Sequence, residues 1–215
     1  MSTLEVLFER WCRLLKDARA TCDPAETFES IREAYSEPHR RYHTLEHILD
    51  CLQEFDTVQR LAFDPIAVEL AIWFHDIVYV VGQKDNEESS VWTAYNFCQT
   101  SGLGYLIGVV WDLILATKPL ESREGHTPDQ LLISDIDLSG IGAPRNVFKQ
   151  QNALLWEEFG TKFSEEEIRR RETFLFRAFL SRRPFYAVEE MRNRYERRAR
   201  NNIFYYLREL GAATS

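Results

Sequence analysis

Residues 65–80 read PIAVELAIWFHDIVYV, and this stretch decides the fold. The preceding Asp64 and Pro65 together form a helix start signal, because Asp accepts hydrogen bonds from the first free amides and proline suits the first turn. The remainder is polar at only three positions, Glu69, His75 and Asp76. A helix that is apolar on nearly every side belongs in a protein core. We therefore expect one buried central helix that continues to Val80.

Helical periodicity extends outward from this segment in both directions. Amphipathic spacing and start signals predict further helices over 4–18, 25–35, 43–55, 86–99, 106–117, 129–138, 145–159, 165–181 and 184–210. The helix at 165–181 opens on a capping box, Ser164 to Glu167. The chain has only nine Gly and seven Pro in 215 residues and no alternating strand pattern. The expected class is all-α, as a single domain with a core at about 25–140 and a C-terminal helical extension at about 145–212 packed on it.

Composition and charge exclude several classes of protein. No apolar run approaches the roughly 20 residues that span a bilayer, so we expect no membrane association. The first residues do not resemble a secretory signal, and four widely spaced cysteines without a CxxC pair suggest reduced thiols, so we expect a cytoplasmic protein. Residues 169–208 hold twelve Arg and four Glu, but aromatic residues at core-like spacing lie between them. With a net charge of −8, the chain does not suggest a nucleic-acid binder.

The pair His75-Asp76 is the chemical anomaly of the sequence. A buried, unpaired carboxylate costs several kcal/mol, so Asp76 needs a proton, a donor, a cationic partner or a metal ion. A lone His-Asp pair is most simply a structural tie between helices. Two further segments, however, hold the same residue types. His43 and His47 lie upstream, four residues apart and so on one face of the predicted helix, and Asp135 and Asp137 lie downstream. Imidazoles and carboxylates from three segments suit a divalent first-row ion, and no thiolate is offered to it.

The order His, His-Asp, Asp resembles the HD superfamily of metal-dependent phosphohydrolases. The chain is most similar to a bacterial branch of predicted HD phosphohydrolases of about 200 residues. The stretches that carry this resemblance cover most of the chain and are Glu37–His43, Trp73–Asp76, Asn86–Ser90, Ala116–Lys118, Asp135–Leu138 and Ala199–Asn202. The resemblance implies an HD-domain helical bundle with additional C-terminal helices. It also implies hydrolysis of a phosphoester in a small phosphorylated metabolite, with a nucleotide as one option, by a metal-activated water.

The resemblance also implies the ligand set. It assigns His47, His75, Asp76 and Asp137 to the metal, with Asp135 as the alternative for the last position. Two departures from the branch concern substrate contacts. Leu120 stands where many relatives have His, and the stretch around Trp156 lacks an expected Arg.

Phosphoester hydrolysis also needs cations for the phosphoryl oxygens and a group that moves protons. We assign substrate contacts to Arg41, His43 and Lys118, and catalysis to Asp76 together with Glu87 as general base or acid. Each has a simpler interpretation: Arg41 and Lys118 as exposed charges, His43 as a structural hydrogen-bonding group, and Glu87 as a first-turn acid that complements the helix dipole.

Three hypotheses follow for the whole chain. The first is the phosphohydrolase with one divalent ion, Mn²⁺, Fe²⁺, Co²⁺, Ni²⁺, Zn²⁺ or Mg²⁺. The second is a catalytically inactive HD-fold module that binds a nucleotide or nucleic acid. The third is a His/Asp core that metal only stabilises. The sequence names neither the substrate nor the oligomeric state, for which a homodimer is one option.

Overall fold

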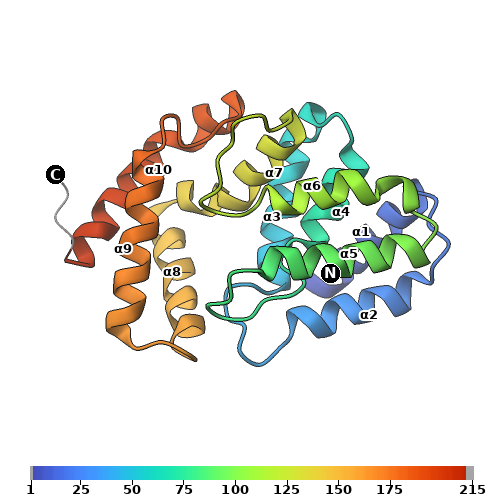
Figure 1. Ribbon diagram of the computed structural model, residues 1–215, viewed down its shortest axis with the longest axis horizontal. Coiled ribbons are helices and arrows are strands. Elements are labelled where there is room, and N and C mark those ends of the chain that lie inside the picture. Colours follow the sequence, from blue (N-terminus) through green and yellow to red (C-terminus); the bar gives the residue numbers. More distant parts are fainter. Residues whose placement is uncertain (1, 212–215) are drawn as a thin grey trace.

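The computed structural model describes residues 2–211, and every regular element in that range is a helix (Figure 1). The all-α class expected from the sequence is therefore confirmed for this part of the chain. The elements are α1 Thr3–Asp17, α2 Pro24–Tyr35, α3 Leu45–Val58, η1 Gln59–Leu61, α4 Pro65–Phe74, α5 Asn86–Thr100, η2 Gly104–Leu106, α6 Ile107–Leu115, α7 Pro128–Asp137, η3 Leu138–Gly142, α8 Arg145–Phe159, α9 Glu165–Ser181 and α10 Glu189–Glu209. Among the described residues, no helix has the length and apolar character needed to cross a bilayer.

Helix α4 is the centre of the core. It begins as predicted, with the Asp64 side chain accepting a hydrogen bond from the Ala67 amide at 2.9 Å and Pro65 in the first turn. All residues from Ala67 to Phe74 are buried, and α1, α3, α5, α6 and α7 pack around the helix. The one acidic residue within it, Glu69, forms an ion pair with Arg10 of α1 at 2.9 Å. Burial on all sides is what the continuous apolar run requires.

The predicted length of this helix is wrong, because α4 ends at Phe74 and not near Val80. Carbonyl groups in its last turn and just after it accept hydrogen bonds from side chains of another segment. The Tyr35 hydroxyl donates to the Trp73 carbonyl at 3.0 Å, and the Arg40 guanidinium donates to the carbonyls of Asp76 at 2.7 Å and Ile77 at 3.0 Å. Helix ends leave such carbonyls without partners, and these donors allow the chain to leave the helix inside the core.

Helices α8, α9 and α10 lie together on one side of the molecule, away from α1 and α2 (Figure 1). The start of α9 at Glu165 agrees with the predicted capping box. The predicted start of the last helix at Pro184 is wrong, because α10 begins at Glu189. The Glu196 carboxylate accepts hydrogen bonds from the amides of Phe185 and Tyr186, so these amides are held outside a helix.

Helix α10 is tied to η3, the short element that follows α7. Asn202 donates to the carbonyls of Ile141 and Ala143, both at 2.9 Å, and Arg198 Nε donates to the Gly142 carbonyl at 2.8 Å. A Cβ atom on Gly142 would lie 2.5 Å from Cβ of Tyr195, so only glycine permits this approach. The C-terminal helices are thereby fixed against the segment that leaves Asp137.

Candidate metal centre

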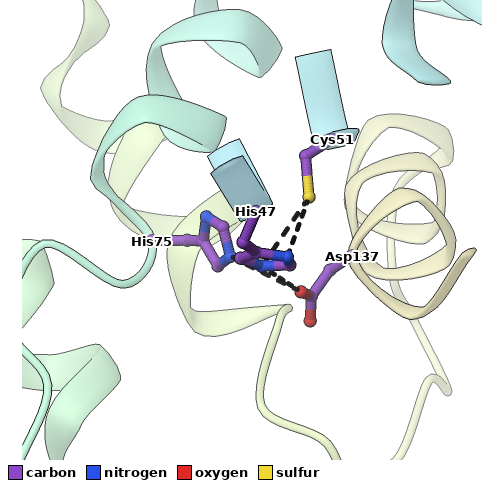
Figure 2. A group of neighbouring side chains, drawn as sticks. All are labelled: His47, Cys51, His75 and Asp137. Carbon is purple, nitrogen blue, oxygen red and sulfur yellow. Dashed lines mark hydrogen bonds and ion pairs between the residues drawn. The ribbon is translucent and has the colours of Figure 1, made fainter. Parts of the chain in front are cut away.

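Four side chains from three helices converge in the interior, and we call them the His/Asp cluster: His47, His75, Asp76 and Asp137. His47 lies on α3, His75 and Asp76 follow the last turn of α4, and Asp137 ends α7. Nε2 of His75 lies 3.3 Å from Nε2 of His47, 3.2 Å from Oδ2 of Asp76 and 3.5 Å from Oδ1 of Asp137. Nε2 of His47 lies 3.3 Å from the same Asp137 oxygen and 3.7 Å from Asp76 Oδ2. Figure 2 shows the side chains of His47, His75 and Asp137 directed toward one another.

The cluster has the spacing and the donor types of a metal site. Two donor atoms bound to one ion at about 2.1 Å lie about 3.0–3.4 Å apart in octahedral or tetrahedral geometry. Nδ1 of His75 lies 2.9 Å from the Ile72 carbonyl oxygen, which accepts its proton and leaves the Nε2 lone pair toward the cluster. The ring of His75 is therefore oriented as a metal-binding imidazole. Nitrogen and carboxylate donors suit divalent first-row ions, so these residues fit such an ion.

Electrostatics within the cluster also favour a cation. Burial alone raises the pKa of Asp76 and of Asp137, but the neighbouring imidazoles outweigh it and hold both pKa values below the usual carboxyl range. Burial likewise acts to lower the pKa of His75, but the charges and hydrogen bonds of Asp76 and Asp137 together outweigh it, so the His75 pKa is raised. The carboxylates thus stabilise positive charge at this point. A bound divalent ion would supply this positive charge instead of the protons on the imidazole rings.

Cys51 lies beside the cluster, a neighbour that the sequence analysis did not anticipate. Donor atoms of His47, Cys51, His75 and Asp137 all lie within 4.8 Å of one another (Figure 2). The Cys51 sulfur is nearly equidistant from the two ring nitrogens of His47, at 3.7 and 3.8 Å, so it lies between them and not beside the Nε2 lone pair. Burial raises the Cys51 pKa well above the usual thiol value, and the nearby carboxylates raise it further. The spacing of four along one helix was the available sequence signal.

Asp135, the alternative last ligand, lies apart from the cluster. Residues two apart on a helix point in nearly opposite directions, and only Asp137 faces the two histidines. The Asp135 carboxylate is fully buried, accepts a hydrogen bond from the Val188 amide at 2.7 Å and lies 3.2 Å from the Arg123 guanidinium. Burial is the main cause that raises its pKa to about 6. Asp135 therefore joins the loop before α7 and the start of α10 to the core.

His43 precedes α3, so the expectation that His43 and His47 share one helical face is wrong. Its Nε2 nevertheless lies 3.9 Å from Asp76 Oδ2, and its ring stacks on Tyr79 with 3.9 Å between centroids. The other ring nitrogen, Nδ1, hydrogen-bonds Oε1 of Glu158 on α8. The second oxygen of Glu158 accepts hydrogen bonds from the amides of Arg41, Tyr42 and His43, at 2.8, 3.1 and 3.2 Å.

Glu158 and Arg40 were missed by the sequence analysis, although both are buried and charged. Arg40 is 3% exposed and donates to the Glu37 carboxylate as well as to the carbonyls of His43, Asp76 and Ile77. Glu158 is 0% exposed. No local pattern marks their role, because the Arg40 contacts with Asp76 and Ile77 span 36 to 37 residues and the Glu158 contacts span 115 to 117 residues. Together they fix the segment that carries His43.

The other residues predicted to bind substrate or take part in catalysis make contacts outside the His/Asp cluster. Arg41 is exposed, and its guanidinium donates to the carbonyls of Pro38 and Arg40. The Lys118 ammonium forms ion pairs with Glu88 and, at 3.6 Å, with Glu121. Glu87 is partly buried; burial is the main cause that raises its pKa, and the Asp76 charge contributes to the increase. The charge of Asp76 therefore acts on Glu87. The side chains of Arg41 and Lys118 are both engaged in contacts with other residues of the protein.

A groove of about 410 Å³ opens beside the cluster. Its walls are one face of α3, the segment from η3 into α8, and α10, and His47 and Asp137 lie among the residues that line it. Volumes of 300–1,000 Å³ are typical of small-molecule sites. Both cluster carboxylates reach solvent, with side-chain exposures of 14% for Asp76 and 21% for Asp137. A small ligand in the groove would contact the cluster through its Asp137 side.

Comparison of the chain with protein-family models, with curated proteins and with solved structures gives no match.

Proposed function

We propose that the protein is a metal-dependent phosphohydrolase of the HD type that cleaves a phosphoester of a small metabolite. The observation that carries the proposal is the convergence of His47, His75, Asp76 and Asp137. The Nε2 atoms of the two histidines lie 3.3 Å apart, and each lies 3.2 to 3.7 Å from an oxygen of both aspartates. These four residues would hold the ion. A bound divalent ion lowers the pKa of water and neutralises charge on phosphoryl oxygens.

The protein's own residues supply the remaining requirements. His43 faces the cluster with Nε2, and its Nδ1 is fixed by Glu158, so it can hold a proton on Nε2 for the leaving oxygen. Glu87 is the second candidate for proton transfer, because its raised pKa keeps a proton closer to neutral pH. Lys118 can reach phosphoryl oxygens only by exchanging its contacts with Glu88 and Glu121.

The test is a screen of phosphomonoesters against the full chain, stripped with a chelator and reloaded with each divalent ion in turn. Wild type is compared with Asp76→Ala, and Asp112→Ala serves as the matched control because Asp112 is exposed on α6. We expect turnover that depends on the ion and falls by more than about 100-fold in Asp76→Ala. Circular dichroism and a thermal melt establish that the variant is folded.

Two outcomes contradict the proposal. The first is that no ester is hydrolysed with any ion, and the second is that Asp76→Ala retains full activity. Binding of a phosphorylated ligand without turnover supports the non-catalytic module instead. Stabilisation by the ion alone, with no further effect of any phosphorylated ligand, supports a structural metal core.

A further inference from the structure

The groove beside the cluster has the dimensions of a site for the non-phosphoryl part of a substrate. Residues 47, 50, 51, 54 and 57 of α3 form one wall, and they extend from the cluster outward. His47 and Glu54 are seven residues apart on α3, so the groove runs about 10 Å from the cluster. Ser139, Gly140 and Gln151 form the facing wall, and Tyr195 and Arg198 of α10 form the third. The hydrogen bonds between α10 and η3 hold these walls at a fixed separation.

Part of the polar lining is already satisfied by the protein. Glu54 accepts a hydrogen bond from the Tyr195 hydroxyl at 2.6 Å and forms an ion pair with Arg194 at 3.0 Å. Arg198 Nε is bound to the Gly142 carbonyl. The polar groups at the outer end of the groove are therefore already engaged in hydrogen bonds and ion pairs within the protein.

Other polar groups retain hydrogen-bonding capacity. The Asp50 carboxylate interacts with the Gln151 side chain and lies near His47. Asp50 and Gln151 belong to opposite walls, and Ser139 lies on the same wall as Gln151. A carboxylate, an amide and a hydroxyl together offer both hydrogen-bond acceptors and donors. Hydroxyl groups of a ligand require both, because a hydroxyl donates one hydrogen bond and accepts others.

The aromatic residues of the groove already pack against other side chains of the protein. The Tyr195 ring is approached by Tyr186, with 5.9 Å between centroids, and by the Arg198 guanidinium at 5.5 Å. The Tyr42 ring packs against His43 and His47, both at 5.0 Å. Stacking on aromatic faces is a main source of affinity for nucleobases, so this lining disfavours a nucleotide.

The charge of the groove disfavours additional phosphates. Three carboxylates, those of Asp50, Glu54 and Asp137, line it against the single guanidinium of Arg198. Like charges a few ångströms apart repel even near a protein surface. A ligand with one phosphoryl group at the cluster and an uncharged body avoids this repulsion.

We propose that the groove binds the polyhydroxy body of a sugar or polyol phosphomonoester, with its hydroxyl groups on Asp50, Ser139 and Gln151. The proposal rests on the phosphohydrolase function proposed above and adds the class of substrate. Asp50 and Gln151 thus determine specificity, whereas the His/Asp cluster acts on the phosphoryl group.

The experiment measures kcat/KM of the metal-loaded full chain for ribose 5-phosphate, glucose 6-phosphate, AMP, ATP and p-nitrophenyl phosphate. Asp50→Ala and Gln151→Ala are compared with two matched controls, Asp112→Ala and Gln150→Ala, whose side chains are exposed outside the groove. We expect a sugar phosphate to be the preferred natural ester. In each groove variant we expect its kcat/KM to fall about tenfold more than that of p-nitrophenyl phosphate, because the lost group leaves a ligand hydroxyl unpaired.

The outcomes separate this proposal from the function on which it rests. If p-nitrophenyl phosphate is hydrolysed and Asp76→Ala abolishes the hydrolysis, the enzyme is established. Preference for AMP or ATP, or equal losses for all esters in both groove variants, then overturns the sugar-phosphate site alone. If nothing is hydrolysed, calorimetry with glucose 6-phosphate and the metal-loaded protein decides: binding that Asp50→Ala abolishes supports the site, and absence of binding overturns it.

Discussion

Replacing Glu158 tests whether this carboxylate organises the segment that carries His43. In Glu158→Ala, the amides of Arg41, Tyr42 and His43 lose their acceptor, and the His43 ring loses its partner. Removal of one member of a buried, hydrogen-bonded ion pair costs about 3–5 kcal/mol. The pKa of Glu158 gives a similar value for its contribution to the free energy of unfolding. Burial acts to raise the pKa of Glu158, but the hydrogen bond and charge of His43 and the backbone amides outweigh it and lower the pKa from 4.5 to about 2. At about 1.4 kcal/mol per pKa unit, this shift corresponds to about 3 kcal/mol of stability at neutral pH.

The pH dependence follows from the direction of that shift. Because the folded pKa is depressed, the contribution of Glu158 is complete above about pH 4.5 and is lost as the pH falls toward 2. His43 behaves in the opposite sense. Burial acts to lower its pKa, but Asp76 and Glu158 outweigh this and raise it, so its contribution is complete below about pH 6.5 and is lost at higher pH. The difference in stability between wild type and a Glu158 variant, followed from about pH 6 to pH 3.5, therefore reports on Glu158 while His43 stays protonated.

The assay is urea unfolding of wild type, Glu158→Ala, Glu158→Gln and the exposed neighbour control Glu157→Gln, with linear extrapolation to water. We expect Glu158→Ala to lower the free energy of unfolding by about 3–5 kcal/mol near pH 6, and Glu158→Gln by less, because the amide oxygen still accepts backbone hydrogen bonds. The difference between wild type and Glu158→Gln should shrink by about 1–1.5 kcal/mol on acidification to pH 3.5. A difference that stays constant over this range would refute the role given to the ionised carboxylate.

Three further predictions concern the cluster and its supports. Addition of Mn²⁺, Co²⁺ or Zn²⁺ at about 100 times its Kd should stabilise the chelator-treated protein by about 2.7 kcal/mol, seen as a higher Tm. This rise in Tm should be absent in His75→Ala and Asp137→Ala and present in Asp112→Ala. Equal rises in all variants would contradict the ligand assignment. Cys51→Ser should keep its affinity for Co²⁺, and the Co²⁺-loaded wild type should lack thiolate-to-cobalt charge-transfer absorption, whereas such a band would make Cys51 a ligand. Arg40→Lys should lower the free energy of unfolding by about 2–4 kcal/mol, since an ammonium cannot reproduce the planar guanidinium that binds the carbonyls of Asp76 and Ile77. A loss below about 0.5 kcal/mol in chemical denaturation would contradict the stabilising role given to Arg40.

The sequence predicted helices well where the signal is local. Helix α9 begins after Ser164 and α4 begins after Asp64, because caps and first-turn proline act within a few residues. The same reasoning failed at the end of α4. The apolar run continues to Val80, and the side chains that bind the carbonyls at the end of the helix and just beyond it, Tyr35 and Arg40, come from a different part of the chain.

The candidate site shows the same division between local and distant information. The residue types of the cluster were visible as polar exceptions in apolar surroundings, and the structure brings His47, His75, Asp76 and Asp137 within a few ångströms of one another. The supports were not visible. Glu158 lies on a helix whose pattern reads as ordinary amphipathic sequence, and its acceptor role depends on where α8 packs. The position of Cys51 beside His47 was accessible from their spacing, but its orientation was not.

The C-terminal helices belong to the site and are not an appendage to it. Helix α8 supplies Glu158, which holds three amides and the ring of the segment before α3. Helix α10 fixes η3 and supplies one wall of the groove. The cluster residues, by contrast, come from α3, α4 and α7, which pack on one another in the core. The proposed ion site is therefore built by the core, whereas the position of His43 and the shape of the groove depend on α8 and α10. Under the proposed function, changes in these helices should alter catalysis and substrate choice before they alter metal binding.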